Sequence, residues 1–162
     1  MILKQGVPLG SVCFNGKCVG VAKNNGRTEG LVKSLMYMGD CFDKSNLPSD
    51  MNISKRLKEE AKYIYKQKLD GKNYLLEMSI YKALKDLYSE LAIQQEQSKN
   101  YKNAIELLNK LLEVLDTAKN ILNKISEKNK VGFNEKEIED MKTEAYLKIA
   151  NIYYIIKTII IP

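Results

Sequence analysis

The chain has 162 residues, of which 44% are hydrophobic and 28% are charged, and these are the values of an ordinary soluble globular protein. Its length lets it bury about two-thirds of its unfolded surface without a disulfide or metal staple. The net charge of +6 comes from 24 lysines and only two arginines, Arg27 and Arg56. Because base-edge and bidentate phosphate recognition depend on arginine, this charge is weak support for nucleic-acid binding.

The first 39 residues contain seven of the nine glycines and are typical of strands and turns. Asn15-Gly16 lies at the centre of residues 11–20, and this dipeptide favours a two-residue hairpin turn. Such a turn places Cys13 opposite Cys18 at a separation that is compatible with a disulfide. An isolated hairpin is marginal in water, so we expect it to pack on the rest of the chain.

A short helix is expected from Thr28 to Met38, with Gly39 as its end. Asp40 and Asp43 then lie on a loop, where carboxylates usually serve as turn or cap residues.

Four helical segments are expected after Pro48, because apolar residues recur there every three or four positions. They cover about residues 52–69, 73–98, 101–127 and the region from 134 onward. Short connections make successive helices antiparallel neighbours. We therefore predict a mainly α fold, an antiparallel bundle of four to five helices with a small N-terminal β-hairpin. Residues 1–50 form the hairpin and short helix, packed on a bundle formed by residues 51–162, in one structural domain overall.

The start of the last helix is the clearest local signal. Asn134 is a suitable N-cap, and Glu137 stands at the capping-box position three residues later. Phe133 and Ile138 occupy the two positions of a hydrophobic staple.

Two apolar strips run along this last helix. One contains Ile138, Met141, Ile149, Ile152 and Ile156, and the other contains Tyr146, Ala150, Tyr153 and Ile160. A helix that is apolar on two sides is buried on both or keeps one side for a partner. The first helix or the hairpin is one possible cover for the second strip. We predict instead that a protein partner, or a second copy of the chain, docks there.

The apolar carboxyl end, residues 149–162, has three interpretations: a buried terminal helix, a membrane-seeking tail, or a helix cut off from a longer parent. No stretch reaches the roughly 18 apolar residues of a membrane span, and the first residues lack the apolar run of a signal peptide. We therefore expect a cytoplasmic protein with no membrane span.

The cysteines are the only candidates for reactive chemistry. Cys13 and Cys18 are reduced thiols, a disulfide, or part of a metal or redox site that also uses Cys41. A zinc site normally needs four Cys or His ligands, and the chain has no histidine. The absence of histidine also excludes Ser-His-Asp and Cys-His catalysis, and no phosphate-binding glycine motif is present. We expect no catalytic residues, no metal and no cofactor.

Tyrosines recur every seven residues at Tyr74, Tyr81 and Tyr88. Such a ridge either stacks bases between lysines or marks an amphipathic boundary with its hydroxyls in water. A nucleic-acid-associated subunit is therefore the second hypothesis. Its expected phosphate contacts lie around the last helical connection and are Lys119, Lys124, Lys128, Lys130 and Lys136.

Residues 88–158 resemble helical-hairpin modules. The residues that carry the likeness to a tetratricopeptide repeat are Tyr88, Leu91, Ala92, Asn100, Tyr101, Ala104, Tyr146, Ile149, Ala150 and Tyr153. The segment is also similar to the microtubule-interacting-and-trafficking (MIT) domain, a related three-helix bundle in which an Asn-Tyr-x-x-Ala turn opens the second helix. This resemblance implies a scaffold or adaptor that binds a partner's amphipathic helix in a groove between its helices.

Overall fold

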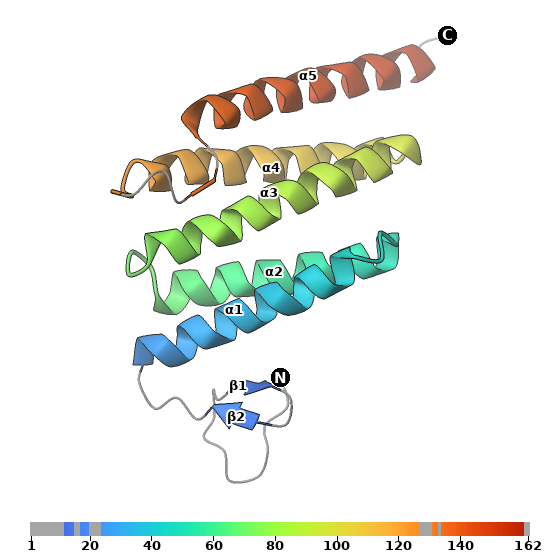
Figure 1. Ribbon diagram of the computed structural model, residues 1–162. Helices are drawn as coiled ribbons and strands as arrows, with labels where there is room; N and C mark the ends of the chain where they lie inside the picture. The colour runs from blue at the N-terminus through green and yellow to red at the C-terminus, as the bar shows by residue number, and fades with distance from the viewer. Residues whose placement is uncertain (1–11, 15–16, 20–23, 127–130, 133, 161–162) are drawn as a thin grey trace. The chain divides into compact units, whose positions relative to one another are not determined.

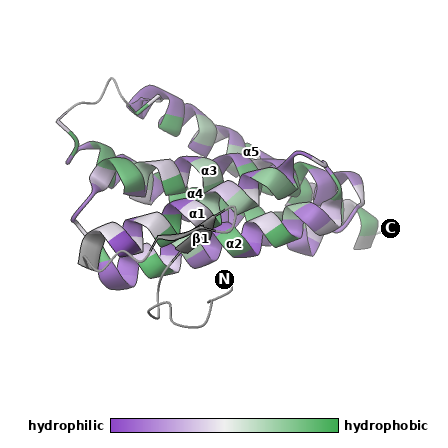
Figure 2. Ribbon diagram, turned by 60° about the horizontal axis from the view of Figure 1, so that its bottom comes forward, coloured by the Kyte–Doolittle hydropathy of each residue, from purple (hydrophilic) through white to green (hydrophobic). Residues whose placement is uncertain are grey.

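The computed structural model describes residues 12–14, 17–19, 24–126, 131–132 and 134–160. The described residues form five helices and two short strands (Figure 1). Their bounds are β1 Val12–Phe14, β2 Lys17–Val19, α1 Asn24–Asp43, α2 Pro48–Lys68, α3 Tyr74–Gln97, α4 Tyr101–Leu122 and α5 Glu135–Ile160. Hydrophobic and hydrophilic residues alternate along the helices, as one-sided burial requires (Figure 2). The predicted helical bundle is confirmed.

The strands β1 and β2 pair antiparallel, with Cys13 opposite Cys18 and Phe14 opposite Lys17. Residues 15–16, which would form the turn, lie outside the described residues. The side chains of both cysteines also lie outside them. A hairpin docked on the helices, and a disulfide between its cysteines, therefore stay predictions.

The contacts divide the chain into two compact units, Met1–Asn73 and Tyr74–Pro162. The amino-acid composition changes near residue 50, but the boundary between the two units lies after residue 73. The boundary is later because α2 packs along α1 and belongs to the first unit. The division of the sequence into 1–50 and 51–162 follows composition and stays a prediction.

In the first unit, α1 is longer than the predicted helix and runs through Gly39 to Asp43. The expectation that Gly39 ends the helix was wrong, because this glycine is a packing residue. A Cβ built on it would lie 3.0 Å from Cε of Lys58 and 3.2 Å from Oγ of Ser54, both on α2. Its missing side chain lets the two helices approach each other closely.

The carboxylates of Asp40 and Asp43 belong to the last turn of α1 and not to a loop. Both bind the ammonium group of Lys58, whose Nζ lies 2.9 Å from Oδ1 of Asp40. The Lys58 side chain is only 3% exposed. Burying a charge is costly unless it is paired, so these two carboxylates are what allows a lysine at this position.

In the second unit, α3 and α4 form an antiparallel helical pair. Ten side chains of α4 are buried, and they include a stripe spaced by three or four: Ala104, Leu107, Leu108, Leu111, Leu112, Val114, Leu115, Ala118, Ile121 and Leu122. The turn before α4 places Lys99 at a φ of 61°. The amide of Asn100 donates to the carbonyl of Gln95, 2.8 Å away, and the amide of Lys99 donates to that of Glu96. This is a Schellman motif with lysine at the position that glycine usually occupies.

The predicted N-cap of α5 is confirmed. Oδ1 of Asn134 accepts a hydrogen bond from the amide of Glu137 at 2.9 Å, and the Asn134 carbonyl accepts one from the amide of Ile138. Phe133 lies outside the described residues, so the staple stays a prediction.

Candidate functional site

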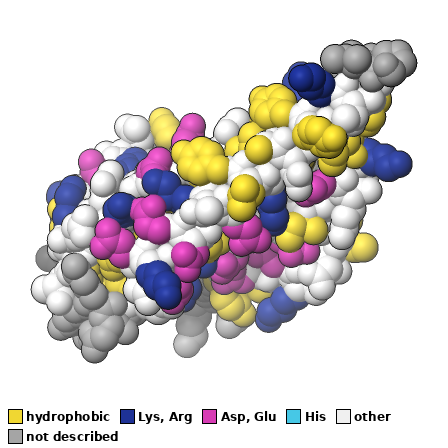
Figure 3. Space-filling model, turned by 90° about the horizontal axis from the view of Figure 1, so that it is seen from above, with side chains coloured by type: hydrophobic (Ala, Val, Ile, Leu, Met, Phe, Trp, Pro, Cys, Tyr) yellow, Lys and Arg dark blue, Asp and Glu magenta, His cyan; other side chains and the backbone are white. Residues whose placement is uncertain are grey.

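The second half of α5 carries large apolar side chains on its surface. Tyr146 and Tyr153 are 56% and 57% exposed, and Leu147 and Tyr154 are 65% and 68% exposed. Ala150 between them is also exposed. We call these five residues the Ala150 face. Figure 3 shows hydrophobic side chains gathered toward the carboxyl end of the chain, and charged side chains toward the other end of the same surface.

The Ala150 face points away from the side that α5 buries. Among the described residues of α5, only Ile138, Ala145 and Ile152 are buried, and they recur every seven positions. At about 100° per residue, these three form one narrow seam, and the five residues of the Ala150 face fall within an arc of about 120° on another side. A helix with three buried side chains is held by far less burial than α4, which has ten.

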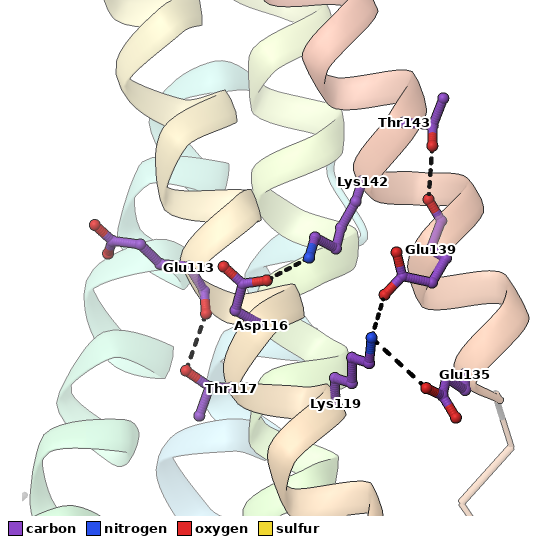
Figure 4. A network of polar contacts seen from close by, with 8 residues as sticks. All are labelled: Glu113, Asp116, Thr117, Lys119, Glu135, Glu139, Lys142 and Thr143. Carbon is purple, nitrogen blue, oxygen red and sulfur yellow. Dashed lines mark hydrogen bonds and ion pairs between the residues drawn. The ribbon is translucent and has the colours of Figure 1, made fainter.

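Ion pairs between α4 and α5 fix how the first half of α5 lies (Figure 4). Nζ of Lys119 lies 2.7 Å from Oε1 of Glu139 and 3.6 Å from Oε1 of Glu135. One turn away, Nζ of Lys142 lies 2.6 Å from Oδ1 of Asp116. The pairs cross between the helices in both directions, so they set the antiparallel register of α5 on α4.

The same contacts shift the titration of their members. The hydrogen bond from Lys119 lowers the pKa of Glu139, and in turn raises the pKa of Lys119. The hydrogen bond to Asp116 raises the pKa of Lys142. Each shift favours the charged form, which is the expected sign for a group with a partner of opposite charge.

A cleft of about 210 Å³ lies on the other side of α5, where α3, α4 and α5 meet. Its lining includes Ile93, Leu111 and Met141, and the ion pair of Glu144 with Lys148. Pockets for small ligands usually measure about 300–1,000 Å³. This cleft therefore suits a side chain of a partner better than a whole small molecule.

The predicted partner-binding residues do come together, with one exception. Tyr146, Ala150 and Tyr153 lie on one exposed side of α5, as above, whereas the side chain of Ile160 lies outside the described residues. Leu147 and Tyr154, which were not predicted from the sequence, widen the strip into a face. Their spacing of seven, one position after Tyr146 and Tyr153, is the signal that could have found them.

Of the predicted phosphate-binding lysines, the structure describes Lys119, Lys124 and Lys136. Lys119 is paired with two carboxylates of α5, and Nζ of Lys124 lies 5.7 Å from the centre of the Tyr74 ring. Lys136 is exposed. Lys128 and Lys130 lie outside the described residues.

Among the described residues, the tyrosine ridge and Cys41 form no chemical site, and the hypotheses on Cys13 and Cys18 stay untested. Tyr81 and Tyr88 are 4% and 1% exposed, so their rings offer no open stacking face. Cys41 is a free, exposed thiol. Within the described part of the chain, no cluster of three or more Cys, Asp or Glu could hold a metal ion.

Comparisons with models of protein families, with curated proteins and with solved structures found no match to this chain. The resemblance to MIT and tetratricopeptide domains therefore stays a prediction. None of the helices in the described ranges is long and apolar enough to cross a membrane.

Proposed function

We propose that this chain is a non-enzymatic helical scaffold or adaptor that binds a protein partner through the Ala150 face of α5. The observation that carries the proposal is the exposure of four large apolar side chains side by side on one helix. Single exposed apolar residues are normal on a protein surface, but contiguous ones mark interaction sites. Tyrosine is also enriched at protein interfaces, where its ring is buried and its hydroxyl is bonded.

The surroundings of the face support a protein partner over a nucleic acid. Lys119, the predicted phosphate contact on α4, is already paired with Glu135 and Glu139 at the start of α5. The other described carboxylates on the first half of α5 are Glu137, Asp140 and Glu144, against the two lysines Lys136 and Lys142. This end of the helix therefore has no excess of positive charge and offers a phosphate backbone little attraction.

The test compares two tyrosines of equal exposure on different helices. Tyr153 on α5 is 57% exposed and Tyr63 on α2 is 60% exposed. A photo-crosslinking amino acid is placed at one position or the other in the full chain, in the cells that produce it. We expect a discrete protein adduct from position 153 and none from position 63. The adduct is identified, purified and bound to the wild-type chain.

The salt dependence of that binding separates the two function classes. An apolar interface changes little between about 50 mM and 200 mM salt, whereas several phosphate contacts lose orders of magnitude in affinity over this range. The proposal fails if position 153 gives no protein adduct, or gives the same adducts as position 63. Binding of mixed-sequence DNA that weakens steeply with salt would favour the nucleic-acid hypothesis instead.

A further inference from the structure

We propose that the occupant of the Ala150 face is a second copy of this chain, bound through an antiparallel, two-fold symmetric pair of α5 helices. The inference rests on the proposed function, since it names the partner of the same face. It is carried by the order of residues along the face, by two charges at its ends and by its area.

The order of residues makes the face complementary to itself. When two copies of α5 run in opposite directions and cross at Ala150, Tyr146 of one copy is level with Tyr154 of the other. Leu147 is likewise level with Tyr153. Each large apolar side chain meets another, and the small Ala150 at the centre lets the helices approach. An interface between identical copies needs this property, because the same patch must serve on both sides.

The charges at the two ends of the face select the antiparallel direction. Asp140 and Lys157 are exposed, and neither has an ion-pair partner among the described residues. In the antiparallel pair, Lys157 of one copy is level with Thr143 of the other, about 4.5 Å along the helix from Asp140. A parallel pair would instead bring like charges together, lysine against lysine and aspartate against aspartate, which is unfavourable.

The area of the face is near the lower limit for a stable interface. With about 200 Å² for each large apolar side chain, the exposed parts of the four contribute on the order of 500 Å² per copy. Two copies then bury about 1,000 Å² of apolar surface, and specific interfaces begin at about 1,000–1,200 Å². The proposed dimer is therefore reversible and depends on protein concentration.

The first test is disulfide formation at the symmetry axis. Cys13, Cys18 and Cys41 are replaced by serine in the full chain, and Ala150→Cys is added. Helix axes 8–10 Å apart bring facing Cα atoms to within about 6 Å, which a disulfide can span. We expect mild oxidation to convert this variant into a covalent dimer. Asn120→Cys, at an exposed position of α4, is the control and stays monomeric.

The second test reads the direction of the pair. Thr143→Cys and Lys157→Cys, each in the same cysteine-free chain, should form little dimer alone, and a covalent heterodimer when they are mixed. Circular dichroism confirms that each variant is folded. A dimer that forms from Thr143→Cys alone and from Lys157→Cys alone, but not preferentially from the mixture, overturns the antiparallel pair.

The mass of the wild-type chain in solution completes the design. We expect it to rise twofold with protein concentration, with little effect of salt. If the mass stays that of a monomer at every concentration and Ala150→Cys forms no disulfide, the proposed dimer is refuted. In that case, a crosslinked adduct of position 153 with a different protein would still support the proposed function. The absence of any adduct at position 153 would refute both the dimer and the proposed function.

Discussion

Two glycines of α1 provide a direct test of how α1 and α2 pack. Replacing a glycine in the interior of a helix by alanine stabilises the helix by about 0.5–1 kcal/mol, because alanine loses less backbone freedom on folding. A Cβ at Gly30 would meet nothing within 4 Å. The variant Gly30→Ala should therefore gain the whole of this amount.

Gly39→Ala brings the same gain in helix propensity but adds a clash. Its Cβ would lie 3.0 Å from Cε and 3.1 Å from Cγ of Lys58. That side chain cannot move aside freely, because Asp40 and Asp43 hold its buried ammonium group. Overpacking of this kind costs about 1–3 kcal/mol. We expect Gly39→Ala to be less stable than the wild type by about 1 kcal/mol, and less stable than Gly30→Ala by about 2 kcal/mol.

Urea unfolding of the full chain measures the difference. With an m-value of about 2 kcal/mol per molar urea, the two variants should differ in midpoint by about 1 M. Lys58→Ala provides the control, because in that background Gly39→Ala should recover most of its loss. Equal midpoints for Gly30→Ala and Gly39→Ala would show that the close approach at Gly39 is not what limits the packing.

Three further changes test single features. Lys99→Gly should raise the free energy of unfolding by about 1 kcal/mol in urea melts, because a non-glycine residue at a φ of 61° is strained; no gain would mean that this turn is not under strain. Asn134→Ala should lower it by about 1 kcal/mol through loss of the α5 cap, whereas Asn134→Asp should preserve most of the cap. The pKa of Glu139 is lower in the folded chain than its unfolded value of about 4.5. Its ionisation therefore stabilises the fold above that unfolded pKa, and this stabilisation is lost as the pH falls through the lower pKa of the folded chain. Glu139→Gln should therefore be less stable than the wild type at neutral pH and approach it in acid, and a difference that is constant with pH would contradict this.

Local sequence signals predicted what is local in this molecule. The spacing of apolar residues located the helices, and the Asn134 cap was found because a cap depends on residues only three apart. The helix ends were less accurate. The helix expected to end near residue 127 ends at Leu122. Beyond it, the amides of Lys124 and Ile125 bond to the carbonyls three residues back, those of Ile121 and Leu122. Gly39 was predicted to end the helix because glycine usually marks a helix end. Its actual role is to make room for Lys58 of α2, and no local sequence pattern connects these two residues.

The candidate site was predictable in part for the same reason. The apolar strip with Tyr146 and Tyr153 follows from helical periodicity, but its exposure depends on which side of α5 meets α4. That choice is made by the seam at Ile138, Ala145 and Ile152 and by the ion pairs with Lys119. The seam and the ion pairs both depend on contacts between segments that are distant in the sequence. The periodicity of one helix cannot predict such contacts.

The narrow seam also connects the fold of α5 to its proposed role. Because few side chains of α5 are buried in its own unit, the ion pairs and the Asn134 cap at its start also contribute to holding it in position. A partner on the Ala150 face would bury a second side of the same helix, and a ligand that binds only the folded state stabilises it. Linkage then works in both directions, since whatever loosens the start of α5 must weaken binding near its end. Asn134→Ala should therefore reduce dimerisation although it lies more than ten residues from Ala150. Undiminished dimerisation would mean that the second half of α5 forms its interface independently of the first.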